Sequence, residues 1–438
     1  MSRKQSLIQI LEEIKLRRFH YELLAVGSLV YMFAAMNVML IAAVMLAIGK
    51  EWSLDPVTIG VLFSAGYVGM FVGAISFGFL ADLIGRKSML LLSVLLMSIF
   101  TALCGVSWDV SSMMVMRFLA GIGLGGTLPQ PGVYISEYVP ARFRGRFIGL
   151  IETSWVYGAL LSLLFPMFLI PTFGWRLTFA TALLPLVLVP VIISRVPESI
   201  RFLERKRRLE DAVGILRRYL GIEIDPSSIT TEIETEKVGV KELWSRKYVR
   251  RTILLWILWA VLVYTYHGIF LWLPSIYHRT FGLEVVKSIW WTLVVTLFQI
   301  PGYYLATFLL DPIGRKKVLI VFLTAAGIGC LLLWMKIEIN WILLWSCVIS
   351  FFNLGSWAAL YTYTPELYPT DIRGTGSGVA ASIGRLSGII APTLTGYLYA
   401  TAGLSGPFLV FFIAHILAAI STLILGIETR KKILEEIS

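Results

Sequence analysis

The sequence predicts an all-α membrane protein with twelve transmembrane helices in two six-helix halves around a central cavity. Three observations lead to this fold class. Of the 438 residues, 57% are hydrophobic and 15% are charged, against about 45–50% and about 25% in soluble globular chains. Apolar stretches recur along almost the whole chain, each of about twenty residues, which is the length that crosses a bilayer core. Two motifs also repeat at one constant offset, which indicates an internal duplication.

The apolar stretches form two groups of six, separated by a long polar segment. The first stretch follows a charged, amphipathic start with Leu7, Ile10, Leu11 and Ile14 on one face. It has no small-residue cleavage site, so we expect a retained span rather than a signal peptide. We expect the spans at 23–48, 57–82, 88–107, 110–136, 147–171 and 175–195, and then at 251–277, 285–310, 317–336, 340–364, 375–402 and 404–427.

This order divides the chain into five parts. They are a cytoplasmic amphipathic N-terminus (1–22), an N-terminal six-helix half (23–195), a cytoplasmic linker with short helices (196–250), a C-terminal six-helix half (251–427) and a cytoplasmic tail (428–438). The linker mixes charges of both signs. We interpret it as a segment that lies against anionic lipid headgroups rather than as a partner-binding site.

Lysine and arginine are distributed unevenly about these spans. On the side of the two termini lie 31 of the 38, five lie on the other side, and Arg117 and Arg385 fall inside spans. Because cytoplasmic loops carry the excess of positive charge, both termini and the linker are predicted to be cytoplasmic. The formal charge of +11 is thereby explained by topology, and no nucleic-acid partner is expected.

The two halves share one register. The turn at 82–87 reads D-L-I-G-R-K and the turn at 311–316 reads D-P-I-G-R-K, an offset of 229 residues. Residues 137–145 after the fourth span and 366–374 after the tenth share Glu, Pro, Arg and Gly at that same offset. Parallel duplicated halves enclose a single path between them, which predicts the central cavity.

These motifs resemble those of the major facilitator superfamily over essentially the whole chain. The D-x-x-G-R-K turns resemble the signature between its second and third spans, and the run at 117–125 resembles its fourth-span motif. The segments 197–203 and 365–369 resemble motifs of its sugar-porter and organic-ion branches. The resemblance implies a secondary transporter that works by alternating access, and it leaves the substrate open.

Shorter stretches are similar to the bacterial niacin transporters, the aromatic-acid:proton symporters and the synaptic vesicle glycoproteins. They lie at 144–155, 268–274, 299–303 and 384–388. This resemblance implies a monomer in the cell membrane that carries a small organic anion with protons. A nicotinate-like aromatic monocarboxylate or a hydroxybenzoate would suit. The alternatives are a neutral substrate, such as a sugar or nicotinamide, and a receptor or scaffold that does not transport.

Glu152 is a candidate proton carrier. A charge at mid-bilayer costs on the order of 2.5–3.5 kcal/mol, so it needs a partner, a wet cavity or a function. Gly145 and Gly149 lie on the helix face of Glu152, as in a face that lines a cavity or packs tightly on a neighbour. A carboxyl group in a dry pocket favours its protonated form, as proton coupling requires. The alternative is a structural ion pair with Arg117 or Arg144.

Arg385 is a candidate ligand for an anionic substrate. Its guanidinium can bind a carboxylate through two parallel hydrogen bonds. By the repeat offset Arg385 corresponds to position 156, about one turn from Glu152, so the two residues can face each other across the path. The alternative is an ion pair between them that latches the halves when the cavity is closed.

Arg117 and the glycines that follow it allow two interpretations each. Arg117 either takes part in proton coupling or anchors neighbouring helices by hydrogen bonds. The run at 121–126 fits G-x-G-x-x-G, but no strand precedes it, so we reject a dinucleotide site. We predict instead that these glycines form a close-packing surface between helices.

The charged residues of the cytoplasmic turns are candidates for a gate. Ion pairs that form in one access state and break in the other give a gate two discrete arrangements. The alternative is static anchoring of the helix ends. The expected gating residues are Asp82 with Arg86 and Asp311 with Arg315, and, as partners at neighbouring helix ends, Glu137 with Arg144 and Glu366 with Arg373.

Polar and aromatic residues within the spans are candidates for substrate contact, because rings stack on a planar ligand and amides orient it. Hydrogen bonds between helices and interfacial belts are the alternative for such residues. Besides Arg385, the residues expected near substrate are Gln299, Asn37, Trp272, Tyr361, Tyr67, Gln130 and Asn353. Tyr303, on the face of Gln299, and Trp357, on the face of Asn353, are further candidates to line the path.

The remaining reactive side chains predict no cofactor or metal. His267 is either a proton relay or a packing residue. Cys104, Cys330 and Cys347 all fall in apolar runs without metal-site spacing. The chain has no phosphate loop, zinc-ligand helix or nucleophile elbow, so we expect neither an ATP-driven pump nor an enzyme.

Overall fold

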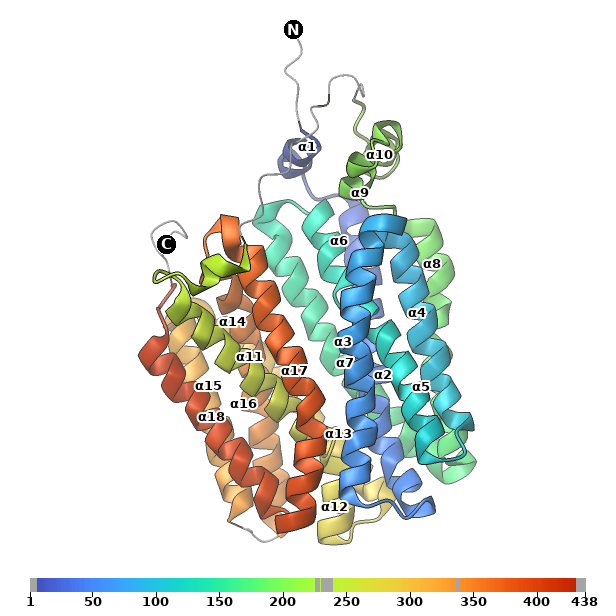
Figure 1. Ribbon diagram of the computed structural model, residues 1–438, viewed down its shortest axis with the longest axis vertical. Helices are drawn as coiled ribbons and strands as arrows, with labels where there is room; N and C mark the ends of the chain where they lie inside the picture. The colour runs from blue at the N-terminus through green and yellow to red at the C-terminus, as the bar shows by residue number, and fades with distance from the viewer. Residues whose placement is uncertain (1–5, 225–228, 230–238, 336–338, 431–438) are drawn as a thin grey trace.

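The computed structural model describes residues 6–224, 229, 239–335 and 339–430, and long helices run side by side through most of this chain (Figure 1). Three short helices, α1 (Leu7–Glu13), α9 (Ile200–Arg205) and α10 (Leu209–Ile215), lie beyond one end of the bundle. We term this end the terminal end and the opposite one the far end. The predicted all-α fold class is confirmed.

The first group of long helices precedes the linker. Its elements are α2 (Arg18–Glu51), α3 (Pro56–Ile84), α4 (Arg86–Leu103), η1 (Cys104–Val106), α5 (Val110–Thr127), α6 (Gln130–Tyr138), α7 (Ala141–Thr178), η2 (Phe179–Val187) and α8 (Leu188–Arg195). Besides α9 and α10, the described part of the linker holds a short π-helix, η3 (Leu216–Leu220), and a short 3₁₀-helix, η5 (Val240–Trp244).

The second group follows the linker and again supplies six spans. Its elements are α11 (Val249–Phe270), α12 (Leu273–Phe281), α13 (Val285–Leu297), α14 (Gln299–Ile313), α15 (Arg315–Trp334), α16 (Ile339–Glu366), α17 (Thr370–Ala402) and α18 (Ser405–Leu425). The two groups meet where α17 packs on α3 and where α13 packs on α7.

Ten helical stretches of the described chain are long and apolar enough to cross a membrane. One of them, Ala141–Arg195, contains the fifth and sixth predicted spans, and its backbone turns at Gly174, where φ is 75°. The eleventh predicted span is α17, whose 33 residues include many small ones and Arg385. Because Ala141–Arg195 holds two spans, the ten stretches contain eleven, and α17 is the twelfth. The described chain therefore has the twelve spans that the sequence predicts.

The sixth predicted span runs through the 3₁₀-helix η2 into α8, and three other predicted spans are interrupted close to a proline. The fourth divides into α5 and α6, the seventh into α11 and α12, and the eighth into α13 and α14. Pro131, Pro274 and Pro301 each stand in the first turn of the second piece. Proline has no N–H to donate, and its ring clashes with the carbonyl four residues earlier, so a helix breaks just before it.

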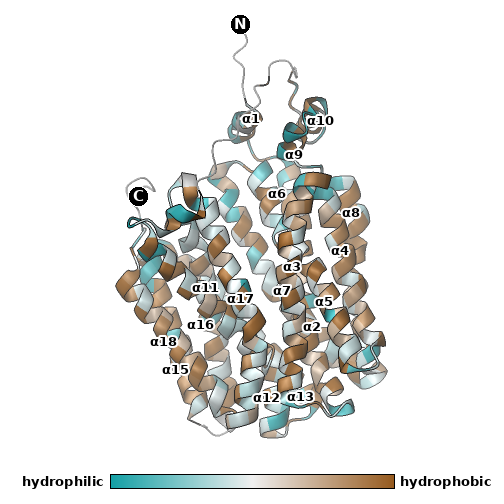
Figure 2. Ribbon diagram, viewed as in Figure 1, coloured by the Kyte–Doolittle hydropathy of each residue, from teal (hydrophilic) through white to brown (hydrophobic). Residues whose placement is uncertain are grey.

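Apolar side chains cover the outside of the bundle as well as its inside. Phe79, Phe168 and Phe308 are 67%, 63% and 74% exposed. Figure 2 shows hydrophobic residues along the lengths of the helices and hydrophilic ones gathered at the terminal end. Lipid, not water, solvates such a surface at low cost, so the structure describes a multi-pass membrane protein.

Glycines bring α3 and α5 into backbone contact. A Cβ placed on Gly69 or Gly73 would lie 2.1 Å from the carbonyl oxygen of Phe118 or Ile122, and one on Gly125 would lie 2.1 Å from that of Met70. Only a residue without a side chain fits such an approach, as at other membrane helix interfaces. The predicted close-packing surface of the fourth span is confirmed.

Two glycines of α3 allow a matched test of this contact. In Gly69→Ala the methyl group meets the backbone of α5, and overpacking of this kind costs about 1–3 kcal/mol. In Gly78→Ala the methyl group meets no atom within 4 Å. We expect thermal unfolding of the detergent-solubilised protein to show a clearly lower midpoint for Gly69→Ala alone. Equal midpoints for the two variants would contradict this packing.

Candidate functional site

A cavity of about 260 Å³ lies between the two groups of helices. Its wall takes residues from α2, α3 and α7 of the first group and from α11, α14, α16 and α17 of the second. Glu152 and Arg385 are its charged residues. Aromatic rings form most of the remaining wall, namely Tyr31, Tyr67, Trp155, Trp259, Tyr266, Tyr303, Trp357 and Tyr361, together with the imidazole of His267.

Glu152 enters the cavity from α7 and is held by a tyrosine. The hydroxyl of Tyr31 on α2 donates a hydrogen bond to its Oε2 at 2.5 Å. Arg117 and Arg144, the partners considered for a structural ion pair, bond elsewhere. Arg117 donates to the carbonyl of Asn37 at 3.4 Å, and Arg144 pairs with Glu12 at 3.0 Å. That alternative for Glu152 is therefore wrong for the described structure.

Arg385 reaches the cavity from α17, on the face that also presents Ala381 and Gly388 to it. No ion pair joins Arg385 to Glu152 or to another carboxylate of the described residues. The latch between Arg385 and Glu152, the alternative drawn from the sequence, is therefore not formed in this structure. Two opposite charges share one cavity and neither neutralises the other, so both stay available to a ligand.

The aromatic side chains of the wall are fixed by hydrogen bonds and ring contacts. The indole N–H of Trp155 donates across the two groups to the hydroxyl of Tyr266 at 2.7 Å. The indole N–H of Trp259 donates to Thr364 at 3.0 Å, and its ring packs edge-on against Trp357 and Tyr361, each 5.6 Å away. Rings held in this way offer flat, preformed surfaces to a planar ligand.

Five residues predicted near substrate do not line this cavity. Gln299 lies behind the wall, where its Oε1 accepts from Tyr266 at 3.3 Å. Trp272 donates to the carbonyl of Pro392 at 3.1 Å, and Asn353 donates to Thr265 and His415 at 3.0 and 3.1 Å. Asn37 and Gln130 are buried elsewhere in the first group. Tyr361, Tyr67 and Arg385 are the predicted binding residues that do line it.

Arg117 is buried behind the cavity wall, with 2% of the residue exposed. It contacts α2 through the carbonyl of Asn37 and lies against Gly66 of α3, where a Cβ would stand 2.9 Å from its guanidinium. The side chain therefore bridges three helices of the first group. This is the geometry of the anchor that the sequence allows as one of its two interpretations.

Sequence reasoning missed four aromatic residues of the wall: Tyr31, Trp155, Trp259 and Tyr266. Trp155 had a readable signal, because it stands three residues after Glu152 and so shares its helix face. Tyr31 and Tyr266 lie in helices that are apolar on nearly every side. In such helices the pattern does not single out the side that meets a cavity.

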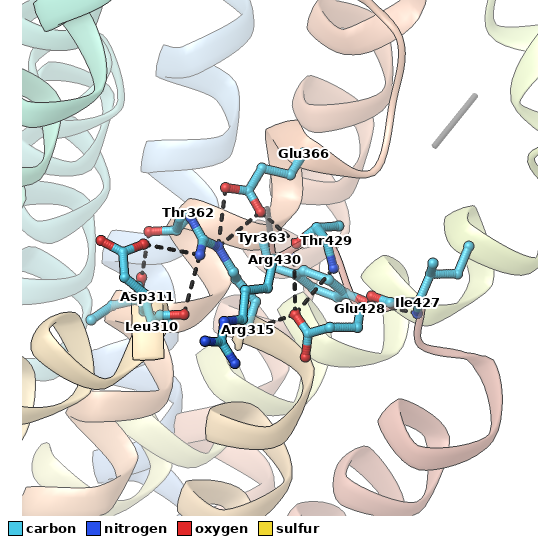
Figure 3. A network of polar contacts seen from close by, with 11 residues as sticks. Leu310, Asp311, Arg315, Thr362, Tyr363, Glu366, Ile427, Glu428, Thr429 and Arg430 are labelled. Carbon is cyan, nitrogen blue, oxygen red and sulfur yellow. Dashed lines mark hydrogen bonds and ion pairs between the residues drawn. The ribbon is translucent and has the colours of Figure 1, made fainter. Parts of the chain in front are cut away.

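At the terminal end, two ion pairs repeat the internal duplication. Arg86 pairs with Glu137 at 2.8 Å, and Arg315 pairs with Glu366 at 3.1 Å. Each pair joins the start of one helix to the end of another, at the 229-residue offset of the motifs. Figure 3 shows the second pair, with Arg315 between Glu366 and Asp311.

The other predicted gating residues bond as follows. Asp311 pairs with Arg315 at 3.1 Å, as the sequence predicts. The predicted pair of Asp82 with Arg86 is not formed between these described residues. Asp82 pairs instead with Arg205 of α9 at 3.4 Å, and Arg86 pairs with Glu137. The Nε–H of Arg373 donates to the carbonyl of Tyr368 at 3.3 Å. The partners contributed by α1 and α9, Glu12 and Arg205, lie far from the motifs in sequence and were not predicted.

Two further carboxylates cap helix starts beside these pairs. Oε1 of Glu198 accepts from the backbone N–H groups of Arg86 and Lys87 at 2.8 and 3.1 Å. Oε1 of Glu428 accepts from the backbone N–H of Arg315 at 3.0 Å. Free N–H groups at a helix start attract such anions. The segment after each group of helices is thus tied to the start of that group's third span.

The comparisons with known proteins agree with this geometry. The family model described as "Sugar (and other) transporter" matches residues 30–438. The chain belongs to this transporter family. The niacin transporter NiaP of Acinetobacter baylyi is 39% identical over 98% of this chain and 99% of that protein. The benzoate transport protein of the same organism is 27% identical over 91% of this chain and 87% of that protein.

The fold of the family is also found among solved structures. A partially occluded, inward-open conformation of the xylose transporter XylE from E. coli matches with a TM-score of 0.78. It covers 95% of this chain and 100% of that chain at 18% identity. The protein is a secondary transporter with the major facilitator fold, and it is not an enzyme.

In this transporter the two groups of helices touch at the far end. Ser64 of α3 donates to the carbonyl of Ile389 on α17 at 2.6 Å, and a Cβ on Gly60 would lie 2.7 Å from the carbonyl oxygen of Pro392. Toward the terminal end, Gly149 of α7 and Gly378 of α17 have no atom within 4 Å of a Cβ position. The cavity is therefore sealed at the far end and less closely packed toward the terminal end.

Cysteine labelling tests this asymmetry. Gly378→Cys places a thiol in open space on the face of Arg385, whereas Ser64→Cys places one in the sealed contact, where Ser64 is 8% exposed. Cys104, Cys330 and Cys347 are buried and give a low background. A water-soluble maleimide should label Gly378→Cys much faster than Ser64→Cys in the purified protein. Faster labelling of Ser64→Cys would show that the far end is open.

Proposed function

We propose that this transporter takes up a small aromatic monocarboxylate, such as nicotinate, together with protons. In this proposal it is a monomer in the cell membrane, with both termini in the cytoplasm. Its six-helix halves, 23–195 and 251–427, rock about the cavity. The observation that carries the proposal is the joint presence of Arg385 and Glu152, without an ion pair between them, in an aromatic cavity. Niacin and benzoate, named for two relatives, are aromatic monocarboxylic acids.

In this scheme Arg385 binds the carboxylate and the rings hold the aromatic part of the substrate. A guanidinium and a carboxylate match through two parallel hydrogen bonds, which are strong where water is excluded. Tyr361 and Tyr67 line the same cavity and contact the ring. A volume of about 260 Å³ lies just below the usual 300–1,000 Å³ range of ligand sites, which suits a single-ring acid.

A sugar is a poorer fit to this wall. Its hydroxyls would need several unpaired donors and acceptors, because desolvated polar groups that stay unpaired are costly. The amide groups of Gln299, Asn353 and Asn37 lie outside the cavity, and the indoles of Trp155 and Trp259 already donate to the protein. The hydroxyl of Tyr67 and the indole of Trp357 are among the few groups of the described wall that are left unpaired. This favours an aromatic cargo over the neutral sugar considered from the sequence.

Glu152 carries the proton in the proposed cycle. Protonation removes its charge, so substrate anion and proton cross together with less charge exposed to the membrane. A monovalent anion and one proton cross as a neutral pair, so the pH gradient rather than the membrane potential drives their entry into the cell. Arg117 lies outside the wall. We assign it the anchoring role rather than a step in proton transfer.

The gate in the proposed cycle is the set of ion pairs at the terminal end. Closure of that end requires α7 and α17 to approach, so the pairs next to them must rearrange. Arg86 with Glu137 and Arg315 with Glu366 give each half one such contact. Asp82, Asp311, Arg144 and Arg373 extend the two sets, and their exchange of partners gives the gate discrete states.

The role of Arg385 is tested by uptake in proteoliposomes. Arg385→Ala removes charge-assisted hydrogen bonds worth about 1.5–3 kcal/mol, so uptake of dilute nicotinate or benzoate should fall at least about tenfold. Arg385→Lys keeps the charge but loses the planar guanidinium, so its uptake should lie between that of the unaltered protein and that of Arg385→Ala. Arg18→Ala, at a side chain that is 87% exposed, serves as control. Undiminished uptake by Arg385→Ala would rule out this anion site.

The role of Glu152 is tested by separating exchange from accumulation. Glu152→Gln keeps the shape and a hydrogen-bond acceptor for Tyr31 but cannot gain or lose a proton. Counterflow exchange of substrate should continue, while accumulation driven by a pH gradient should be lost. Glu51→Gln, whose carboxylate pairs with Arg176 outside the cavity, should behave as wild type. Accumulation that survives in Glu152→Gln would place the proton elsewhere.

A further inference from the structure

The imidazole of His267 has no part in the binding scheme above, although it lines the same cavity. It stands on α11 among the rings of Tyr67, Trp155 and Tyr266, whose centroids lie 4.9, 6.3 and 5.3 Å from its own. These neighbours come from three helices in both groups. His267 therefore stands where the two groups meet at the cavity.

One hydrogen bond fixes the tautomer of this imidazole. Its Nδ1 lies 3.0 Å from the carbonyl oxygen of Val263, one turn earlier on α11. A carbonyl oxygen only accepts, so Nδ1 carries the hydrogen and donates it. In the neutral ring, Nε2 is then an acceptor. Among the described residues Nε2 has no hydrogen-bond partner, and the ring faces the cavity.

Three polar groups of the neighbouring wall are already engaged. The indole of Trp155 donates to Tyr266, whose hydroxyl donates in turn to Gln299. The indole of Trp259 donates to Thr364. Within the described chain, Nε2 of His267, the hydroxyl of Tyr67 and the indole N–H of Trp357 have no hydrogen-bond partner in this part of the wall. The indole can only donate and the hydroxyl can donate or accept, whereas Nε2 of the neutral ring can only accept.

The position of His267 relative to Arg385 suits the two ends of one small ligand. Gly384 and Gly388 flank Arg385 on α17, and a Cβ on either would lie 2.9 or 3.3 Å from a methyl group of Val263. His267 stands four residues further along α11, about 6 Å toward the far end at 1.5 Å per residue. An aromatic acid whose carboxylate binds Arg385 therefore extends its ring toward Nε2.

We propose that His267 selects the substrate through its ring. Its Nε2 accepts a hydrogen bond from a donor on the ring away from the carboxylate, which is either a hydroxyl or a protonated ring nitrogen. The preferred cargo is then an aromatic monocarboxylate with such a donor. The inference rests on the proposed function, because it takes the carboxylate at Arg385 as given. A ligand whose ring has no donor leaves Nε2 buried and unpaired, which lowers the affinity of that ligand for the cavity.

Matched ligands test this proposal on the unaltered protein. Isothermal titration calorimetry on the purified full-length chain compares 3- and 4-hydroxybenzoate with 3- and 4-methoxybenzoate and with benzoate. The methoxy acids have the same oxygen but no hydrogen to donate. We expect one hydroxy isomer to bind about two- to tenfold more tightly than its methoxy counterpart and than benzoate, the range for a single neutral hydrogen bond.

Variants identify the residue that is responsible. In His267→Leu the hydroxy-to-methoxy ratio of affinities should fall to about one, whereas His267→Gln, with an amide oxygen as acceptor, should keep part of it. His415→Leu is the matched control. His415 also donates from Nδ1 to a carbonyl one turn earlier, that of Phe411 at 2.7 Å, but its Nε2 accepts from Asn353 outside the cavity. In His415→Leu the hydroxy-to-methoxy ratio of affinities should be unchanged.

The outcomes separate this inference from the proposed function. Equal binding of hydroxy and methoxy acids by the unaltered protein overturns the role of His267 and leaves the proposed function standing. A hydroxy-to-methoxy affinity ratio that persists in His267→Leu also overturns the role of His267 and leaves the proposed function standing. If none of the aromatic acids binds, the proposed function fails and this inference fails with it.

Discussion

An ionised side chain inside a bilayer is expensive, at on the order of 2.5–3.5 kcal/mol even on lenient scales, and the most economical remedy is an ion pair. Arg385 and Glu152 line the same cavity without forming one. Glu152 is held by a neutral tyrosine, and Arg385 is flanked on its helix face by small residues. Every other feature of the proposed cycle depends on this separation, because a neutralised pair would leave no charge for an incoming anion or proton.

The ion pairs that do form lie away from the cavity, at the terminal end. There they repeat in both groups of helices, with Arg86 on Glu137 and Arg315 on Glu366. The far end is closed differently, by backbone contacts such as that of Gly60 with Pro392. Ion pairs can exchange partners in water at low cost, while backbone packing is either formed or not. In the proposed cycle this difference lets the two ends open at different times.

The sequence predicted the fold because the relevant signals are local. Twelve spans follow from apolar length, the duplication from two motifs in one register, and the glycine surface of α5 from residue spacing alone. The cavity was predicted less completely. Glu152 and Arg385 stood out by their cost in a membrane, but Gln299 and Asn353 were expected in the wall and lie behind it. Which way an apolar helix turns is decided by all its neighbours, and so the tyrosine that holds Glu152 had no signal in the sequence.

In the proposed cycle, substrate anion and proton bind to the same cavity. Calorimetry of an aromatic acid binding to the purified protein, repeated in buffers with different ionisation enthalpies, counts the protons taken up with the ligand. We expect an uptake of up to about one proton per ligand near neutral pH, and none in Glu152→Gln. If the binding heat of the unaltered protein is the same in all buffers over the pH range in which it transports, ligand and proton do not bind together.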